Sequence, residues 1–213
     1  MTDPLNLILV LGAAALVPFL AIVATSFIKL SVVFLLVRNA LGVQQIPPNM
    51  ALNALAIILS GYIMTPVIVQ TYDILSTGAF TFSGVEGLKA AYEAGRGPLM
   101  RFLTQHAGER EKLFFLEAAQ TLWTPELAAR IGPDSVAIVL PAFTVSQLRE
   151  AFEIGFLLYL PFIAIDLIVS NILLAMGMMM VSPLTISLPF KLFLFVMVDG
   201  WSRLILGLVK TYV

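Results

Sequence analysis

The sequence predicts an all-α, membrane-associated protein built from two helical hairpins, with four long apolar helices and a small helical soluble insert. Three observations carry this prediction. Sixty per cent of the 213 residues are apolar and 12% are charged, whereas soluble domains are about 45–50% apolar and about 25% charged. The mean hydropathy is +0.98. The charges are also unevenly spread, because residues 73–135 hold 14 charged side chains and the other 150 residues hold 11.

The composition excludes several classes of function. A net charge of −1 with 12 basic residues argues against nucleic acid as a partner, because binding a polyanion needs clustered lysine and arginine. A chain without cysteine has no disulfides, thiolate catalysis or iron–sulfur clusters. Walker A, GxGxxG, HExxH and GxSxG patterns are absent from the sequence, and it holds one histidine. We therefore expect no enzyme, no cofactor and no metal site.

The charge distribution divides the chain into three parts. Residues 1–72 form an N-terminal apolar hairpin, residues 73–135 a soluble insert and residues 136–213 a C-terminal apolar hairpin. The first apolar run, residues 5–37, would be about 50 Å long as one helix. The hydrocarbon core of a bilayer is about 30 Å thick, so this run must tilt, kink at Pro18 or extend beyond the membrane.

Glycine and proline set the predicted ends of the first hairpin. Gly42 permits a positive φ, and Pro47-Pro48 cannot lie inside a helix, so a loop is expected here. The second span, residues 51–69, is expected to end near Pro66. In the insert, turns are predicted at Gly84, Gly87 and residues 95–98, and the apolar spacing over residues 109–123 predicts an amphipathic helix.

The second hairpin begins with a predicted helix start. Thr144 and Gln147 have the spacing of a capping box, which places the first residue of a helix there. Residues 154–180 form the third span and residues 184–208 the fourth. The turn between them is expected between Met176 and Pro183.

Positive charges suggest an orientation in the membrane. Lys29 and Arg38 are assigned to the first hairpin tip and Lys191 lies near the second, whereas the insert holds eight acids and six bases. The positive-inside bias then places both tips in the cytoplasm, and the insert and both termini outside.

Four ionisable residues lie inside the third and fourth apolar spans: Asp166, Lys191, Asp199 and Arg203. Such residues are costly and usually face a partner or a water-filled cavity. If the second hairpin turns at residues 178–179, Asp166 and Lys191 lie equally far from the tip, roughly 19 Å, and pair within one hairpin or between copies. A turn nearer Ser182 instead brings Asp166 level with Asp199. A structural salt bridge is favoured over a proton relay, because a relay needs a chain of titratable groups.

Four of the nine methionines fall within five positions, at Met176, Met178, Met179 and Met180. Methionine is flexible and soft, so a ring of such side chains from several subunits would close around variable cargo. The simpler interpretation, a loop whose methionines fill gaps in a core, stays open on the residues alone.

Long motifs in both apolar blocks resemble one family. Residues 141–156 (PAFTVSQLREAFEIGF) and 189–201 (PFKLFLFVMVDGW) are similar to the two characteristic motifs of the FliP/SctR export-gate proteins of flagella and type III secretion injectisomes. Residues 38–49 (RNALGVQQIPPN) and 176–183 (MGMMMVSP) resemble further family stretches. The form of residues 44–48, and the lack of a recognisable cleavable signal, are more similar to the injectisome branch than to the flagellar one.

The resemblance implies a core subunit of an export gate at the bacterial inner membrane. About five copies form a ring around a protein-conducting channel, together with two smaller membrane proteins (FliQ/SctS-like and FliR/SctT-like). Unfolded substrates pass through it, and membrane lipid surrounds it. The family's methionine gasket maps onto Met176, Met178, Met179 and Met180, and its inter-subunit salt bridge onto Asp166 and Lys191. The alternative is a stand-alone proton-coupled transporter that uses Asp166.

Overall fold

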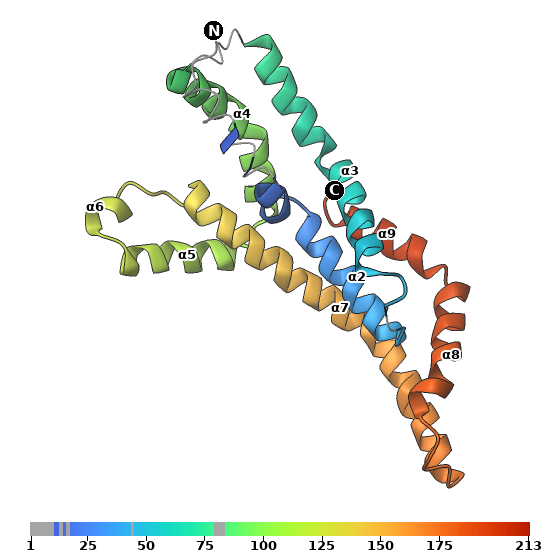
Figure 1. Ribbon diagram of the computed structural model, residues 1–213. Helices are drawn as coiled ribbons and strands as arrows, with labels where there is room; N and C mark the ends of the chain where they lie inside the picture. The colour runs from blue at the N-terminus through green and yellow to red at the C-terminus, as the bar shows by residue number, and fades with distance from the viewer. Residues whose placement is uncertain (1–10, 13–14, 16–17, 44, 79–83) are drawn as a thin grey trace. The chain divides into compact units, whose positions relative to one another are not determined.

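The computed structural model describes residues 11–12, 15, 18–43, 45–78 and 84–213, and every regular element in this part of the chain is helical. The predicted all-α class is therefore confirmed (Figure 1). The helices are α2 (Phe27–Leu41), α3 (Asn49–Thr77), α4 (Gly84–His106), α5 (Glu109–Leu122), α6 (Pro125–Ala128), α7 (Val136–Ala175), α8 (Pro183–Met197) and α9 (Gly200–Lys210).

Within this described part, two helices, not four, are long and apolar enough to cross a membrane by themselves: α3 and α7. The bent pair of α8 and α9 adds a third span if it is counted as one. The first predicted span is interrupted, because the helical residues 18–23 are followed by a bend at residues 24–26 before α2 begins. With 15 residues, α2 is about 22 Å long, too short for the hydrocarbon core. Residues 5–10 of that predicted span lie outside the described residues.

Contacts between Cα atoms divide the chain into two compact units. One comprises residues 1–28 and 60–147, the other residues 29–59 and 148–213. Helices α3 and α7 contribute residues to both units. The three-part division into hairpin, insert and hairpin concerns the membrane environment of each segment, and it stays a prediction.

Three expected breaks in the first unit are absent, because its helices accommodate proline and glycine. Helix α3 continues through Pro66, where an end was expected. Proline removes one backbone donor, and near this site the Thr65 hydroxyl donates a hydrogen bond to the Gly61 carbonyl (2.9 Å). Helix α4 likewise runs through Gly87 and through residues 95–98, where Gly95 lies against the side chains of α3: a Cβ there would be 3.5 Å from atoms of Leu75.

The predicted capping box at Thr144 is wrong, because α7 begins eight residues earlier at Val136. Thr144 lies inside the helix, and its hydroxyl donates to the Leu140 carbonyl one turn before it (2.9 Å). Gln147 is fully buried, and its side-chain amide donates to the His106 carbonyl at the end of α4 (3.2 Å). Gln147 therefore holds the corner between α4 and α5 rather than a helix start. The predicted amphipathic helix over residues 109–123 is confirmed as α5.

The loop between α7 and α8 lies where the sequence predicts it, between Ala175 and Pro183. Gly177 has a φ of 73°, its N–H donates to the Leu174 carbonyl (3.0 Å), and the Met178 N–H donates to the Leu173 carbonyl (2.9 Å). This pair of bonds is a Schellman motif, which needs a left-handed residue after the helix and so favours glycine. Helix α8 then runs back beside the C-terminal part of α7 (Figure 1).

The fourth predicted span is broken between α8 and α9, which meet at 60°. Asp199 adopts a left-handed conformation with a φ of 53°. The next residue, Gly200, lies against an aromatic ring, since a Cβ at this position would be 2.4 Å from ring atoms of Phe195. The backbone at Asp199 and the packing of Gly200 together stop the helix, although hydropathy continues through the break.

Helices α2 and α7 pack closely at Gly155, and we expect Gly155→Ala to destabilise the protein. A Cβ at this buried position would lie 2.2 Å from Leu36 Cδ1 and 3.1 Å from Leu36 Cβ. Overpacking of this kind costs about 2 kcal/mol, measurable as a lower thermal midpoint in detergent. Gly207→Ala in α9 is the control, because nothing lies within 4 Å of the position that its Cβ would take, and it should stabilise by up to about 1 kcal/mol. Equal midpoints for the two variants would contradict the close approach.

Candidate functional site

Lys191 joins three helices in the second unit. Its ammonium lies 2.6 Å from the Asp166 carboxylate of α7 and donates to the Ala40 carbonyl near the end of α2 (3.2 Å). Ser187, one turn earlier in α8, donates to the other Asp166 oxygen (2.6 Å). Lys191 is 2% exposed. A cation is favoured beside the last carbonyls of a helix, so this lysine stabilises the end of α2 as well as neutralising Asp166.

The structure therefore brings Asp166 and Lys191 together within one chain, which is one of the two arrangements that the hairpin arithmetic allows. Asp199 does not lie in this cluster: its carboxylate accepts a hydrogen bond from the Ser202 hydroxyl (2.9 Å). The partners of Asp166, a lysine and a serine, support a structural salt bridge over a proton relay. The contact between subunits that the family resemblance implies for this pair stays a prediction.

We expect the Asp166–Lys191 pair to show strong coupling in a double-mutant cycle. Lys191→Met leaves Asp166 with its serine partner alone and should cost about 2 kcal/mol, less than a fully buried pair because the carboxylate is about one-third exposed. Asp166→Asn leaves the buried ammonium with the Ala40 carbonyl. The double variant should be more stable than the sum of the two single changes predicts, by about 1–2 kcal/mol. Thermal unfolding in detergent measures this, and additive effects would show that the pair is not coupled.

A second buried lysine, Lys29, was missed as a site residue. It is 1% exposed, and its ammonium lies 2.6 Å from Glu150 Oε2 and 3.1 Å from the Thr211 hydroxyl. The same ammonium lies 4.3 Å from the ring centroid of Tyr212, within the range of a cation–π interaction. A lysine within an apolar run does indicate a site, because an unpaired charge there is costly. Its partners Glu150 and Thr211 lie 121 and 182 residues further along the chain, so the sequence does not identify them.

The tip assignment was wrong for Lys29, and Lys191, which was expected near the other tip, lies within a helix. Lys29 lies near the start of α2, far along the chain from the loop at residues 42–48, and Lys191 lies inside α8. Arg38 alone contacts a tip, where its guanidinium donates to the Pro47 carbonyl (3.3 Å) and to the Asn49 side chain. Two of the three positive charges that supported the predicted orientation therefore do not lie in a tip. The orientation in the membrane stays a prediction.

The environment of Tyr212 changes its acidity. Burial raises the pKa of the Tyr212 phenol well above its usual value, and the negative charge of Glu150 raises it further by a smaller amount. Both causes act in one direction, because each disfavours the phenolate. The neutral phenol is therefore part of the folded state around Lys29.

This shift predicts a loss of stability in alkali. The folded state keeps the Tyr212 proton, whereas the unfolded chain releases it above about pH 10. The protonated Tyr212 phenol thus makes its full contribution to the free energy of unfolding below about pH 10. That contribution decreases as the pH rises further. The thermal midpoint of the wild type should fall more steeply between about pH 9 and 11 than that of Tyr212→Phe. Tyr72→Phe removes an exposed phenol as a control, and identical slopes for all three proteins would contradict the assignment.

The four methionines of the predicted gasket lie at the loop between α7 and α8, and all are exposed. Their exposed fractions are 67% for Met176, 41% for Met178, 83% for Met179 and 101% for Met180. They do not fill gaps in the core of this chain, which was the simpler interpretation. Their contacts with other copies stay a prediction.

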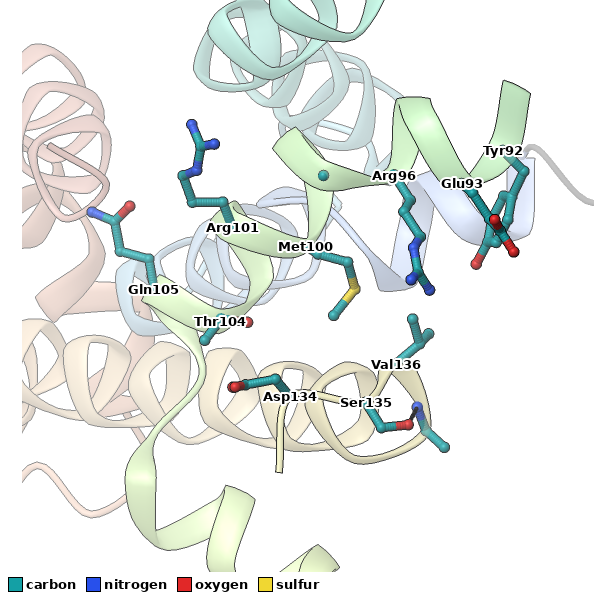
Figure 2. Close-up of a pocket in the computed structure, with 12 residues that line it drawn as sticks. Tyr92, Glu93, Arg96, Met100, Arg101, Thr104, Gln105, Asp134, Ser135 and Val136 are labelled. Carbon is teal, nitrogen blue, oxygen red and sulfur yellow. Dashed lines mark hydrogen bonds between the residues drawn. The ribbon is translucent and has the colours of Figure 1, made fainter. Parts of the chain in front are cut away.

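A cleft of about 1140 Å³ lies between α4 and the start of α7. Figure 2 shows Arg96 extending from α4 toward Ser135 and Val136, whereas Arg101 and Gln105 point away. Acidic and basic side chains both line it, so the cleft favours neither an anionic nor a cationic ligand. Within the described part of the chain, no group of three or more His, Asp or Glu side chains is placed to hold a metal ion.

Comparison with known proteins assigns the family. The chain matches the FliP family over residues 10–208. The chain belongs to the FliP family. It is 56% identical to the Yop proteins translocation protein R of Yersinia pestis over 210 residues, which cover 99% of this chain and 97% of the relative. It is 47% identical to the hypersensitivity response secretion protein HrcR of Ralstonia nicotianae, over 97% and 96% of the two chains, and 46% identical to the virulence protein YscR of Salmonella typhimurium, over 99% and 97%.

Membership of the FliP family confirms the resemblance that the motifs predicted, on its injectisome side. The chain is a membrane protein of type III secretion, with two or three candidate spans among its described residues. This family implies a role in protein translocation rather than in catalysis.

Proposed function

We propose that this FliP-family chain is a core subunit of an injectisome export gate, in which about five copies form a ring around a channel for unfolded proteins. The observation that carries the proposal is the exposed methionine loop. The relatives, which this chain matches over nearly their whole length, are named for translocation and secretion. The gate lies in the bacterial inner membrane, with residues 73–135 in the periplasm. Two smaller FliQ/SctS-like and FliR/SctT-like membrane proteins complete it.

The surface of α8 supports assembly with other chains. Phe193, Val196 and Met197 are each more than 60% exposed. Apolar patches of this kind mark contacts with proteins or lipid. In a ring, neighbouring copies cover part of this surface, and lipid covers the remainder.

The methionine loop supports a gasket. Met179 and Met180 are almost fully exposed at the end of the α7–α8 hairpin, and the Schellman motif at Gly177 fixes the direction in which the loop leaves α7. Flexible thioether side chains pack against many different surfaces. Several copies of the loop therefore close a pore to ions and still admit polypeptides of varied sequence.

The salt bridge supports the gate by holding the hairpin that carries this loop. Lys191 is buried inside its own chain, whereas Asp166 is about one-third exposed. In the assembled ring, the contact between subunits is made from the exposed side of the Asp166 carboxylate. The alternative, a proton-coupled transporter that uses Asp166, lacks support because its lysine partner already neutralises that carboxylate.

Replacement of Met178, Met179 and Met180 by alanine should make the closed gate leak small ions while assembly persists. Alanine removes the side chains that fill the pore but leaves the loop backbone unchanged. Single-channel conductance of the purified complex measures the leak, and particle images count the copies. Met197→Ala, an exposed methionine of α8, is the matched control and should stay closed. A monomeric particle without a pore, or a triple variant as tight as the wild type, would overturn the proposal.

A further inference from the structure

A preformed apolar cavity in the second unit contains one exposed arginine. The cavity has a volume of about 410 Å³ and is lined by Leu158, Pro161 and Phe162 of α7, Leu194 and Phe195 of α8, and Arg203 of α9, with four further residues. This volume lies in the range of about 300–1,000 Å³ that is usual for ligand pockets. Among the described residues that line it, Arg203 alone is charged.

Aromatic packing holds the walls of this cavity in place. The Phe195 ring lies 6.4 Å from that of Phe162 and meets the Trp201 ring edge-on at 5.4 Å. Gly200 permits this, because a Cβ there would be 2.4 Å from the Phe195 ring. Side chains that are already ordered lose little entropy when a ligand binds. The cavity is therefore built before any ligand arrives.

Arg203 has no hydrogen-bond or ion-pair partner for its guanidinium among the described residues, although it lies in an apolar segment. It also lies in the first turn of α9, where the helix dipole disfavours a cation. Helix stability therefore does not explain its presence. Asp199, four residues earlier, does not neutralise it: Asp199 accepts from Ser202 and lines a separate cavity.

We propose that this cavity binds an anionic phospholipid, with an acyl chain against α7 and α8 and the phosphate at Arg203. The observation that selects this occupant is charge complementarity within a candidate membrane span. A guanidinium binds a phosphodiester through two parallel hydrogen bonds, and basic pockets between membrane helices bind anionic headgroups. The apolar walls of the cavity contact the acyl chain of the lipid. The inference goes beyond the export-gate proposal and does not depend on ring formation.

Native mass spectrometry of the full-length protein, extracted from membranes and exchanged with added lipid, tests this. Wild-type protein should retain phosphatidylglycerol over phosphatidylcholine of the same acyl chains by about fivefold, the ratio that one lysine or arginine near an anionic headgroup supplies. Arg203→Gln should bring the ratio close to one. Arg149→Gln, an exposed arginine of α7 in the same unit, is the matched control and should keep the preference. An unchanged ratio in Arg203→Gln would overturn the proposal.

A second measurement on the wild type keeps the test independent of the variant's folding. Phosphatidylglycerol with a photoreactive acyl chain should cross-link to residues 158–162 and 194–198, and excess inorganic phosphate should not prevent it. Cross-links elsewhere in the chain would overturn the site. Complete competition by phosphate would show a simple anion site and overturn the lipid assignment, and so would a neighbouring protein chain that fills the cavity.

Discussion

The buried ammonium of Lys191 is the interaction on which the second unit depends. It connects α7 through Asp166, α2 through the Ala40 carbonyl and α8 through its own backbone. A buried charge is tolerated only if its partners replace the water that it has lost. One cation thus joins α8 to both α2 and α7, and the Ser187 hydroxyl adds a second bond to Asp166.

Lys29 is a second buried lysine that pairs with a carboxylate, and it lies at the other end of α2. Its carboxylate partner, Glu150, also comes from α7, 16 residues before Asp166, which is about 24 Å along the helix. Helix α7 therefore supplies both acids and other helices supply both bases. The cluster at Lys29 also includes Thr211 and Tyr212, so the last residues of the chain are ordered by a charge that lies near the start of the unit.

The few charges of the apolar segments have different roles according to their burial. Lys29 and Lys191 are buried and paired inside the chain, where they define its fold. Arg203 is exposed beside an apolar cavity, where it is available to a ligand from outside. The exposed methionines complete this pattern, since neutral side chains at the loop leave it without a fixed charge preference for its contacts.

The sequence by itself determined the helical class, the presence of membrane-spanning helices, the loop at Met176–Pro183 and the family, because composition and long motifs are local properties that no partner residue alters. It did not determine the breaks. Pro66 lies inside a helix. A helix ends at Asp199 and Gly200 although the apolar sequence continues beyond them. It also left open the partner of Asp166 and missed that of Lys29. Only the tertiary structure decided these points, since each depends on contacts between residues far apart in the chain, such as an ammonium and a carboxylate that lie 121 positions apart.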